Sequence, residues 1–189
     1  MTLVLPTKPA LLLIDVQQAF EDASFGQSYP ANVDRHIEEL LVAWRGRQLP
    51  VVIVRHDSTE PNSLLRPERP GNALKAFVEP RQGEWLISKN VNSAFIGTDL
   101  ESKLRSAGID TLVIAGYTSQ HCVNTTVRMA ANLGFHVILV EDACVAFELT
   151  YHGERIDALQ VQRLSMASLA GEFAQIVDTE RLLAANPIS

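Results

Sequence analysis

The sequence of 189 residues contains few cysteines and no long apolar run. Its apolar runs, such as residues 51–54 and 137–140, have the length of a strand and fall far below the roughly 20 residues that cross a bilayer. The first six residues have neither the basic start nor the apolar core of a secretory signal. Two cysteines, Cys122 and Cys144, do not make a disulfide framework. We therefore expect a cytoplasmic protein that does not bind a membrane.

Several motifs of nucleotide, metal and nucleic-acid sites are also missing. The ten glycines form neither G-x-G-x-x-G nor a P-loop, so nothing predicts a phosphate cradle. No two of the five histidines have the spacing of helical ligands and there is no C-x-x-C, so we expect neither a metal nor another cofactor. With 16 basic and 22 acidic residues the net charge is −6, and no basic stretch predicts a nucleic-acid partner.

The sequence does contain a regular alternation of strand-like and helix-like patterns. An apolar fraction of 47% and a length of 189 residues suit a single domain over residues 1–189. Short apolar runs separated by helices are typical of a mostly parallel sheet covered on both faces. We predict an α/β protein, a Rossmann-like three-layer α/β/α sandwich with a six-stranded sheet. The predicted strands are residues 10–16, 51–54, 85–88, 111–115, 136–140 and 173–177, and the predicted helices are residues 33–47, 98–108, 122–133, 154–169 and 178–185.

Two local features add to this prediction. Thr98 and Glu101 have the spacing of a capping box at the start of one helix. Residues 57–83 form the one long irregular segment, which is rich in proline, arginine and glutamate. A loop of that length inside a compact domain is usually functional. We expect it to shape or cover the entrance of a pocket.

Three reactive side chains lie at the ends of predicted strands. Asp15 closes an apolar run, Lys89 follows another, and Cys122 lies between a strand and the helix after it. In an open parallel sheet, sites form at the carboxyl ends of strands. An ammonium beside a thiol favours the thiolate, and a carboxylate can accept the thiol proton. The alternative is a buried ion pair of Asp15 and Lys89, with Cys122 as an inert bystander.

Three segments around these residues resemble the isochorismatase-like cysteine hydrolases, a family that includes the nicotinamidases. They read Leu-Leu-Ile-Asp-Val-Gln-Gln-Ala-Phe at 12–20, Lys-Asn-Val-Asn-Ser-Ala-Phe at 89–95 and Gly-Tyr-Thr-Ser-Gln-His-Cys-Val at 116–123. The resemblance covers nearly the whole chain and implies a catalytic triad of Asp15, Lys89 and Cys122. It further implies an oxyanion hole formed by the backbone N–H groups of Thr118 and Cys122, with a cis peptide bond before Thr118. It also implies a homo-oligomer, either a dimer or a tetramer.

The reaction implied by the resemblance is hydrolysis of an amide-like C–N bond of a small molecule, through a cysteine acyl intermediate. Two alternatives stay open: cleavage of an enol ether, as in isochorismatases, and a thiol redox or binding protein on the same fold. The Asp-x-His metal motif of nicotinamidases is absent, because the corresponding residues are Arg55, His56, Asp57 and Ser58. This departure argues against a metal and against nicotinamide as the substrate.

Further residues are candidates for the walls of a substrate pocket. Gln17 lies two residues beyond the aspartate and would share its side of an extended backbone. His56 lies at the start of the irregular segment, where binding residues concentrate. Phe20, Phe95 and Tyr117 offer apolar surface, although a core role suits each of them equally well.

Other residues near these motifs are given structural interpretations. His121 adjoins Cys122, but successive side chains at a helix start point in different directions, so we do not expect it to be the base. Cys144 follows a predicted strand and is interpreted as a buried structural residue. Val127 and Met129 fit either an interface between subunits or the core.

Overall fold

Seven strands form the main sheet in the computed structural model of the protein, which describes residue 5 and residues 8–185. They are β1 (Ala10–Ile14), β2 (Ser28–Tyr29), β3 (Val51–His56), β4 (Trp85–Lys89), β5 (Thr111–Tyr117), β6 (His136–Phe147) and β9 (Gln175–Val177). The order across the sheet is β2-β6-β5-β1-β3-β4, and β9 also pairs with β6. All six predicted strands are present and pair in parallel, while the short β2 adds an antiparallel pairing with the end of β6.

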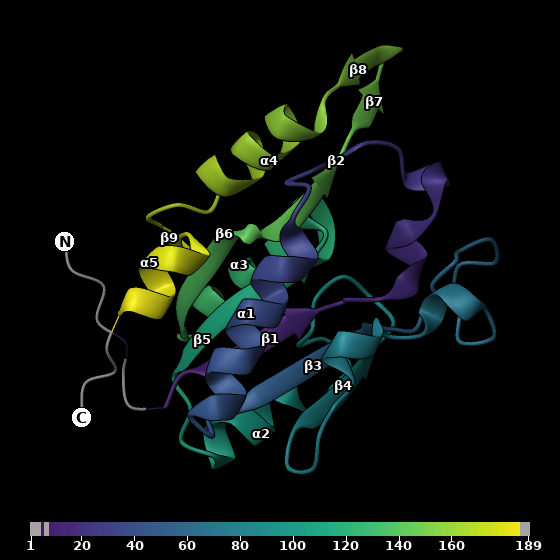
Figure 1. Cartoon of the computed structure of the whole chain (residues 1–189). Helices are drawn as coiled ribbons and strands as arrows, with labels where there is room; N and C mark the ends of the chain where they lie inside the picture. Colours follow the sequence, from purple (N-terminus) through teal and green to yellow (C-terminus); the bar gives the residue numbers. More distant parts are fainter. Residues whose placement is uncertain (1–4, 6–7, 186–189) are drawn as a thin grey trace.

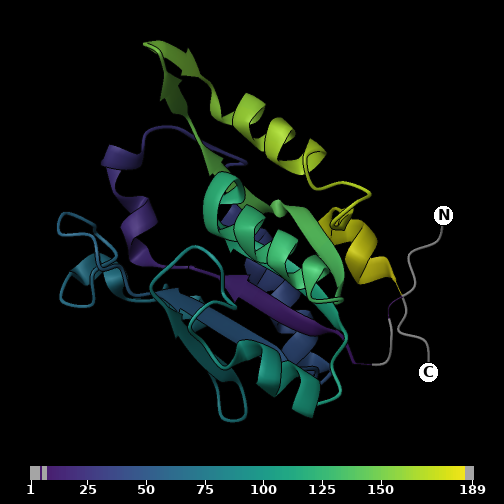
Figure 2. The same ribbon diagram turned by 180° about the vertical axis from the view of Figure 1, so that it is seen from behind.

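Helices cover both faces of this sheet, which confirms the predicted three-layer α/β/α sandwich (Figures 1 and 2). One face carries α1 (Val33–Gly46) and α5 (Thr179–Ala184), and the other carries α2 (Leu100–Ser106), α3 (Asn124–Asn132) and α4 (Ala158–Ala167). Successive side chains of a strand point to opposite faces, so Leu11 and Leu13 join the core under α1, whereas Leu12 and Ile14 join the other core. Within the described residues, no helix is both long and apolar enough to cross a bilayer.

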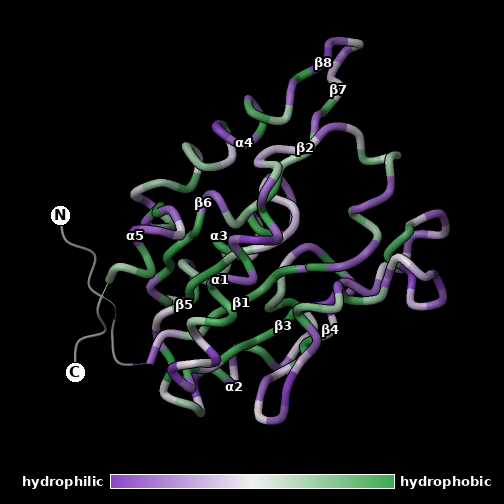
Figure 3. The backbone as a smooth tube through the Cα atoms, viewed as in Figure 1, coloured by the Kyte–Doolittle hydropathy of each residue, from purple (hydrophilic) through white to green (hydrophobic). Residues whose placement is uncertain are grey.

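The hydrophobic residues concentrate in the central strands. Figure 3 shows β1, β3 and β5 as hydrophobic segments through the middle of the molecule. All five residues of β1 and all seven of β5 are buried. These continuous apolar runs are what a strand covered on both faces requires.

The segment after β6 differs from its prediction. The helix predicted over residues 154–169 starts later, because β7 (Leu149–Tyr151) and β8 (Glu154–Ile156) form a hairpin that projects from the sheet in Figure 1. The helix α4 begins only after Asp157, whose side chain accepts the N–H of Gln160. Strand β6 also runs on past residue 140, because its later residues pair with β5 beyond a bulge and with β2. Such distant partners leave no periodic signal in the local sequence.

Two helix starts also differ in detail. The predicted capping box is wrong, because α2 begins after Asp99, and Thr98 Oγ1 donates to the carbonyl of Ala94 at 2.6 Å. The same oxygen accepts only a long bond of 3.4 Å from the N–H of Leu100. A π-helical turn, η5 (Ser119–Val123), precedes α3 and contains Cys122. The thiol therefore lies in a π-helical turn directly after β5.

The long segment 57–83 is fastened to the end of the sheet. It contains two short 3₁₀ turns, η3 (Pro70–Asn72) and η4 (Ala76–Val78). The side-chain amide of Asn72 donates to the carbonyls of His56 and Leu65, at 3.0 and 2.8 Å. Two further 3₁₀ turns, η1 (Gln18–Glu21) and η2 (Ala23–Phe25), follow β1 on the same side.

Strands β1 and β5 approach closely at their carboxyl ends. Gly116 has a φ of 129°, and a Cβ atom there would lie 2.1 Å from the carbonyl oxygen of Ile14, so only glycine fits. The residue directly after β1, Asp15, has a φ of 50°, which is uncommon for a residue with a side chain. Backbone strain of this kind is concentrated at functional sites.

Candidate active site

A buried ion pair forms the floor of the site. Lys89 Nζ lies 2.7 Å from Asp15 Oδ2, and both side chains are fully shielded from solvent. The pairing of β3 with β4 sets Lys89 beside His56, and the N–H of Asp15 bonds to Val54 at the end of β3. Neither charge could be buried alone at an acceptable cost in free energy, so each residue requires the other.

The thiol of Cys122 lies directly over this pair. A carboxylate oxygen of Asp15, a ring nitrogen of His56 and Sγ of Cys122 all lie within 4.8 Å of one another. Burial, and then the negative charge of Asp15, raise the pKa of the thiol to about 12, although the charge of Lys89 opposes both. Burial also raises the pKa of Asp15, against the effect of Lys89. The resting thiol is therefore protonated, and a carboxylate of increased basicity lies next to it.

His56 completes the cluster and bears on metal binding. Its Nδ1 lies 2.8 Å from Lys89 Nζ and 3.9 Å from Sγ of Cys122. Burial, and then the charge of Lys89, lower the pKa of His56 to about 4. Asp15, His56 and Cys122 have the atom types of metal ligands, but the ammonium of Lys89 already lies between the carboxylate and the imidazole. A metal cation would have to displace a positive charge there, so these residues fit a metal poorly.

A cavity of about 340 Å³ opens above Cys122. Its polar lining includes His56, Asn92, Thr118 and Gln120, and Asn92 Nδ2 lies 3.7 Å from Sγ of Cys122. The N–H of Thr118 has no hydrogen-bond acceptor among the described residues, and the Tyr117–Thr118 peptide bond is cis, as the resemblance implies. The apolar wall consists of Phe20, Phe25, Leu65, Phe147 and Leu149. A small ligand with an apolar part therefore fits beside the nucleophile.

Of the predicted wall residues, Phe20 and His56 line this cavity and Gln17 does not. The side chain of Gln17 is fully buried, and its amide bonds to backbone groups. Oε1 of Gln17 accepts the N–H of His56 at 2.8 Å, and Nε2 of Gln17 donates to the carbonyl of Asn72 at 2.7 Å. The expectation for Gln17 is corrected accordingly: it holds the wall in position and does not form it.

Phe95 and Tyr117 also lie outside the lining of the cavity, and both belong to the core. Phe95 stacks on Phe135, with the ring centroids 5.8 Å apart. The hydroxyl of Tyr117 donates to Asp34 at 2.6 Å, on the opposite side of the sheet from Phe95. The alternation along β5 assigns Tyr117 to the core under α1, whereas Phe95 lies in the turns after β4 and joins the other core.

Several lining residues were missed by sequence reasoning. Phe147 and Leu149 belong to the unpredicted extension of β6 and the hairpin, so no local pattern marked them. His121 lines the cavity too, but its Nδ1 faces Thr118 Oγ1 at 3.3 Å. Cys144 is fully buried beside the carbonyl of Ile114, as a structural cysteine would be.

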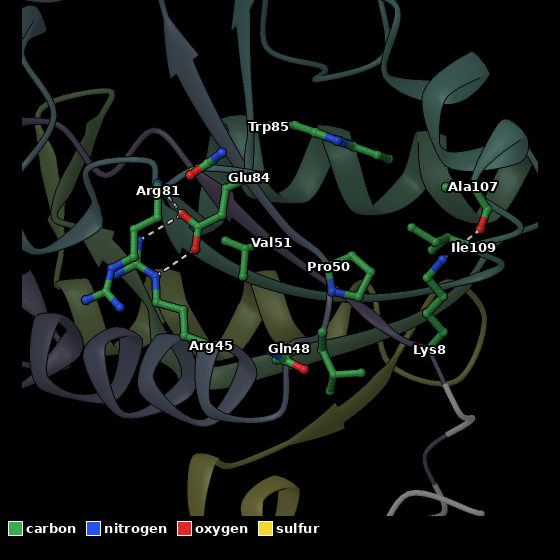
Figure 4. Close-up of a pocket in the computed structure, with 13 residues that line it drawn as sticks. Lys8, Arg45, Gln48, Pro50, Val51, Arg81, Glu84, Trp85, Ala107 and Ile109 are labelled. Atoms are coloured by element: carbon green, nitrogen blue, oxygen red, sulfur yellow. Dashed lines mark hydrogen bonds and ion pairs between the residues drawn. The ribbon is translucent and has the colours of Figure 1, made fainter.

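A second cavity, of about 480 Å³, lies at the amino ends of β3 and β4 (Figure 4). Its main feature is the ion pair in which the guanidinium of Arg45 donates to both oxygens of Glu84, at 2.7 and 2.9 Å. The described residues that line it include no cysteine, serine, threonine or histidine. It therefore offers no thiol, hydroxyl or imidazole group as a nucleophile, although it is the larger of the two cavities.

The fold and the site define a three-layer α/β protein with a buried thiol at the carboxyl edge of its sheet. A family model described as the Isochorismatase domain matches residues 9–180. The isochorismatase family protein YrdC of Bacillus subtilis is 41% identical over 177 residues, which is 93% of this chain and 95% of YrdC. The chain therefore belongs to the isochorismatase family of hydrolases.

Further relatives agree with this assignment. A crystal structure of an isochorismatase-family protein from Chromobacterium violaceum is 48% identical, covers 98% of each chain and superposes with a TM-score of 0.92. A streptothricin hydrolase of Streptomyces noursei is 32% identical over 165 residues, which is 87% of this chain and 58% of that longer protein.

Proposed function

We propose that this protein is a cysteine-dependent hydrolase that cleaves an amide-like C–N bond of a small molecule. The observation that carries the proposal is the position of Cys122 in the cavity, directly over the fully buried pair of Asp15 and Lys89. A thiol, a base and a buried cation in one site are the components of nucleophilic catalysis. The hydrolase relatives support the same class of reaction.

In the first step, Asp15 accepts the proton of the Cys122 thiol. The raised pKa of Asp15 makes it a stronger base than an exposed aspartate, while the charge of Lys89 stabilises the thiolate. Asp15 Oδ1 is buried without a hydrogen-bond partner among the described residues, so it is available for the proton. The thiolate then attacks the carbonyl carbon of the substrate and a C–S bond forms.

The negative charge that develops on the substrate oxygen needs hydrogen-bond donors. We assign this role to the backbone N–H groups of Thr118, which directly precedes the turn η5, and of Cys122, which lies within it. The free N–H of Thr118 at the wall of the cavity supports the assignment.

The second half of the reaction returns the enzyme to its starting state. Asp15 transfers its proton to the leaving nitrogen, the C–N bond breaks and an amine or ammonia departs. Water then attacks the acyl group while Asp15 takes a proton from it, and the C–S bond breaks to release a carboxylic acid and the thiol.

Both alternatives are weaker on this geometry. A one-cysteine redox protein would need only Cys122, and would have no use for a buried cation and carboxylate beneath it. The second cysteine, Cys144, is fully buried and offers no exposed partner for a disulfide. Cleavage of an enol ether has no need of the thiol as a nucleophile, so a thiol-independent activity is what would distinguish it.

The test is ammonia release from a panel of small carboxamides and ureido compounds, with Cys122→Ala as the control. We expect at least one compound to be hydrolysed by the native protein and not by the variant, with unchanged circular dichroism. Cys122→Ser, which keeps the size of the side chain, should be similarly inactive. Full activity of Cys122→Ala on a confirmed substrate would show that the nucleophile is assigned wrongly.

A further inference from the structure

We infer that His56 is a substrate-binding residue that presents a permanent Nε2–H donor to an acceptor oxygen next to the scissile amide. The inference deepens the proposed hydrolase function and rests on it. It narrows the substrate class to small amides with a second acceptor, such as another carbonyl or a carboxylate.

The tautomer of His56 follows from its contact with Lys89. Nδ1 of His56 lies 2.8 Å from Lys89 Nζ, which also donates to Asp15 Oδ2 at 2.7 Å. An ammonium has only donors, so Nδ1 must be the acceptor and cannot carry a proton. A neutral imidazole then has its single hydrogen on Nε2. The depressed pKa of His56, about 4, agrees with a ring that stays neutral at physiological pH.

The Nε2 atom is free for a ligand. It makes no hydrogen bond to any described residue, and it is accessible to solvent. His56 lines the cavity, and its Nδ1 lies 3.9 Å from Sγ of Cys122. Only one ring carbon separates Nε2 from Nδ1, so a group that forms a bond with Sγ would place its neighbouring atoms within reach of Nε2.

The backbone of His56 is held on both sides, which makes the donor rigid. Its N–H donates to Gln17 Oε1 at 2.8 Å, and its carbonyl accepts from Gln17 Nε2 at 3.1 Å and from Asn72 Nδ2 at 3.0 Å. Both fastening side chains are buried. A donor whose position and tautomer are set before the substrate arrives loses little entropy on binding.

The first experiment tests the tautomer without any substrate. Long-range ¹H–¹⁵N correlation spectra distinguish Nδ1–H, Nε2–H and doubly protonated imidazoles, and His56→Gln assigns the resonance. We expect the Nε2–H form throughout pH 6–8. In Lys89→Met we expect the ring to lose this restriction and to show both neutral tautomers. An Nδ1–H or doubly protonated ring at pH 7 in the native protein would overturn the inference.

The second experiment tests the contact with substrate. Malonamate and butyramide have the same length, but only malonamate offers a carboxylate acceptor beyond the amide. A pair matched in this way is chosen from the compounds that the native protein hydrolyses. His56→Ala should raise the KM of the amide with the second acceptor at least tenfold. It should change the KM of the plain amide by less than threefold relative to the native protein. His56→Gln keeps an N–H donor and should recover part of the loss.

Two controls separate this role from a structural one. His121→Gln alters the other histidine of the cavity and should not change the preference between the two amides. Alkylation of Cys122 by iodoacetamide should proceed in His56→Gln at nearly the native rate. Equal losses on both amides in His56→Ala would overturn the inference. If the native protein hydrolyses nothing in the panel, the proposed function fails, whereas the tautomer measurement still decides whether His56 is a fixed donor.

Discussion

Two lysines of this protein are almost fully buried, and each forms a short bond to an aspartate. Lys89 Nζ lies 2.7 Å from Asp15, and Lys75 Nζ lies 2.6 Å from Asp34. The surroundings of the two pairs differ. Asp15 is completely buried, whereas the side chain of Asp34 is 42% exposed.

The pair of Lys75 and Asp34 belongs to a closed network. Lys75 Nζ also lies 3.2 Å from the hydroxyl of Tyr117, and that hydroxyl donates to Asp34 Oδ1. Both carboxylate oxygens are thus occupied, and no reactive group is left over. Such a network is typical of a structural role.

The pair of Lys89 and Asp15, by comparison, does not belong to a closed hydrogen-bond network. Asp15 Oδ1 is buried without a hydrogen-bond partner among the described residues, and the thiol of Cys122 lies over it. The same two residue types therefore stabilise one part of the fold and form the proposed catalytic base in another. The two pairs differ because Asp15 Oδ1 is an unused acceptor, and the thiol of Cys122 is a proton donor next to it.

The largest effect is expected from Lys89→Met. The substitution leaves the Asp15 carboxylate buried without its cation, so the free energy of unfolding should fall by about 3–5 kcal/mol. Hydrolysis should fall by about 10³-fold or more, because the thiolate loses its neighbouring charge. Urea unfolding and kcat/KM on a substrate from the panel measure the two effects. Retention of native activity would remove Lys89 from the mechanism.

The matched change in the closed network is Lys75→Met. Asp34 is partly exposed and can be rehydrated, so we expect a smaller loss of about 1–3 kcal/mol in the free energy of unfolding. Hydrolysis should stay within tenfold of the native rate. A loss as large as that of Lys89→Met would mean that the contrast between the two pairs is wrong.

The pH dependence of the free energy of unfolding should reveal the lowered pKa of His56, which lies beside Asp15, Lys89 and Cys122. The pKa of His56 is about 4 in the folded protein and about 6.5 when unfolded, so the unfolded chain binds more protons between these values. The contribution of His56 to stability is therefore complete above pH 6.5 and lost as the pH falls through 4. After allowance for solvent screening it amounts to about 2 kcal/mol. Unfolding of the native protein and of His56→Gln, compared at pH 7 and pH 4.5, should show a flatter profile for the variant.

A smaller effect is expected for Tyr117→Phe. The variant loses the bond from the hydroxyl to Asp34 but keeps the ring, which stacks on Phe20 at a centroid distance of 5.0 Å. The free energy of unfolding should fall by about 1 kcal/mol. A thermal or urea titration measures this. An effect beyond that of Lys75→Met would place the centre of the network at Tyr117 instead.

The smallest effect is expected from a chelator. Because the ammonium of Lys89 lies where a cation would bind, treatment with EDTA should leave hydrolysis unchanged. Loss of activity that zinc or iron restores would contradict this expectation and would assign Asp15, His56 and Cys122 to a metal.

Much of the fold and of the candidate site could be predicted because the signals are local. Apolar runs of strand length predicted the six parallel strands, and a charge or a thiol at the end of a run marked Asp15, Lys89 and Cys122. The hairpin of β7 and β8 was not predicted, because its mostly exposed strands contain no apolar run. The later part of β6 was not predicted, because its pairing partners in β2 and β5 are distant in the sequence. The role of Gln17 was misjudged for the same reason, since its partners lie on His56 and Asn72.

Local residue order was therefore enough to establish the fold class and to bring three reactive side chains to one edge of a sheet, because parallel strands end at the same edge. It could not show which aromatic residues face the cavity, or that His56 bonds to Lys89. Those features depend on which distant segments meet. They follow from the packing of 57–83 and the end of β6 around the thiol, where burial and hydrogen bonding between remote residues determine each side chain's environment.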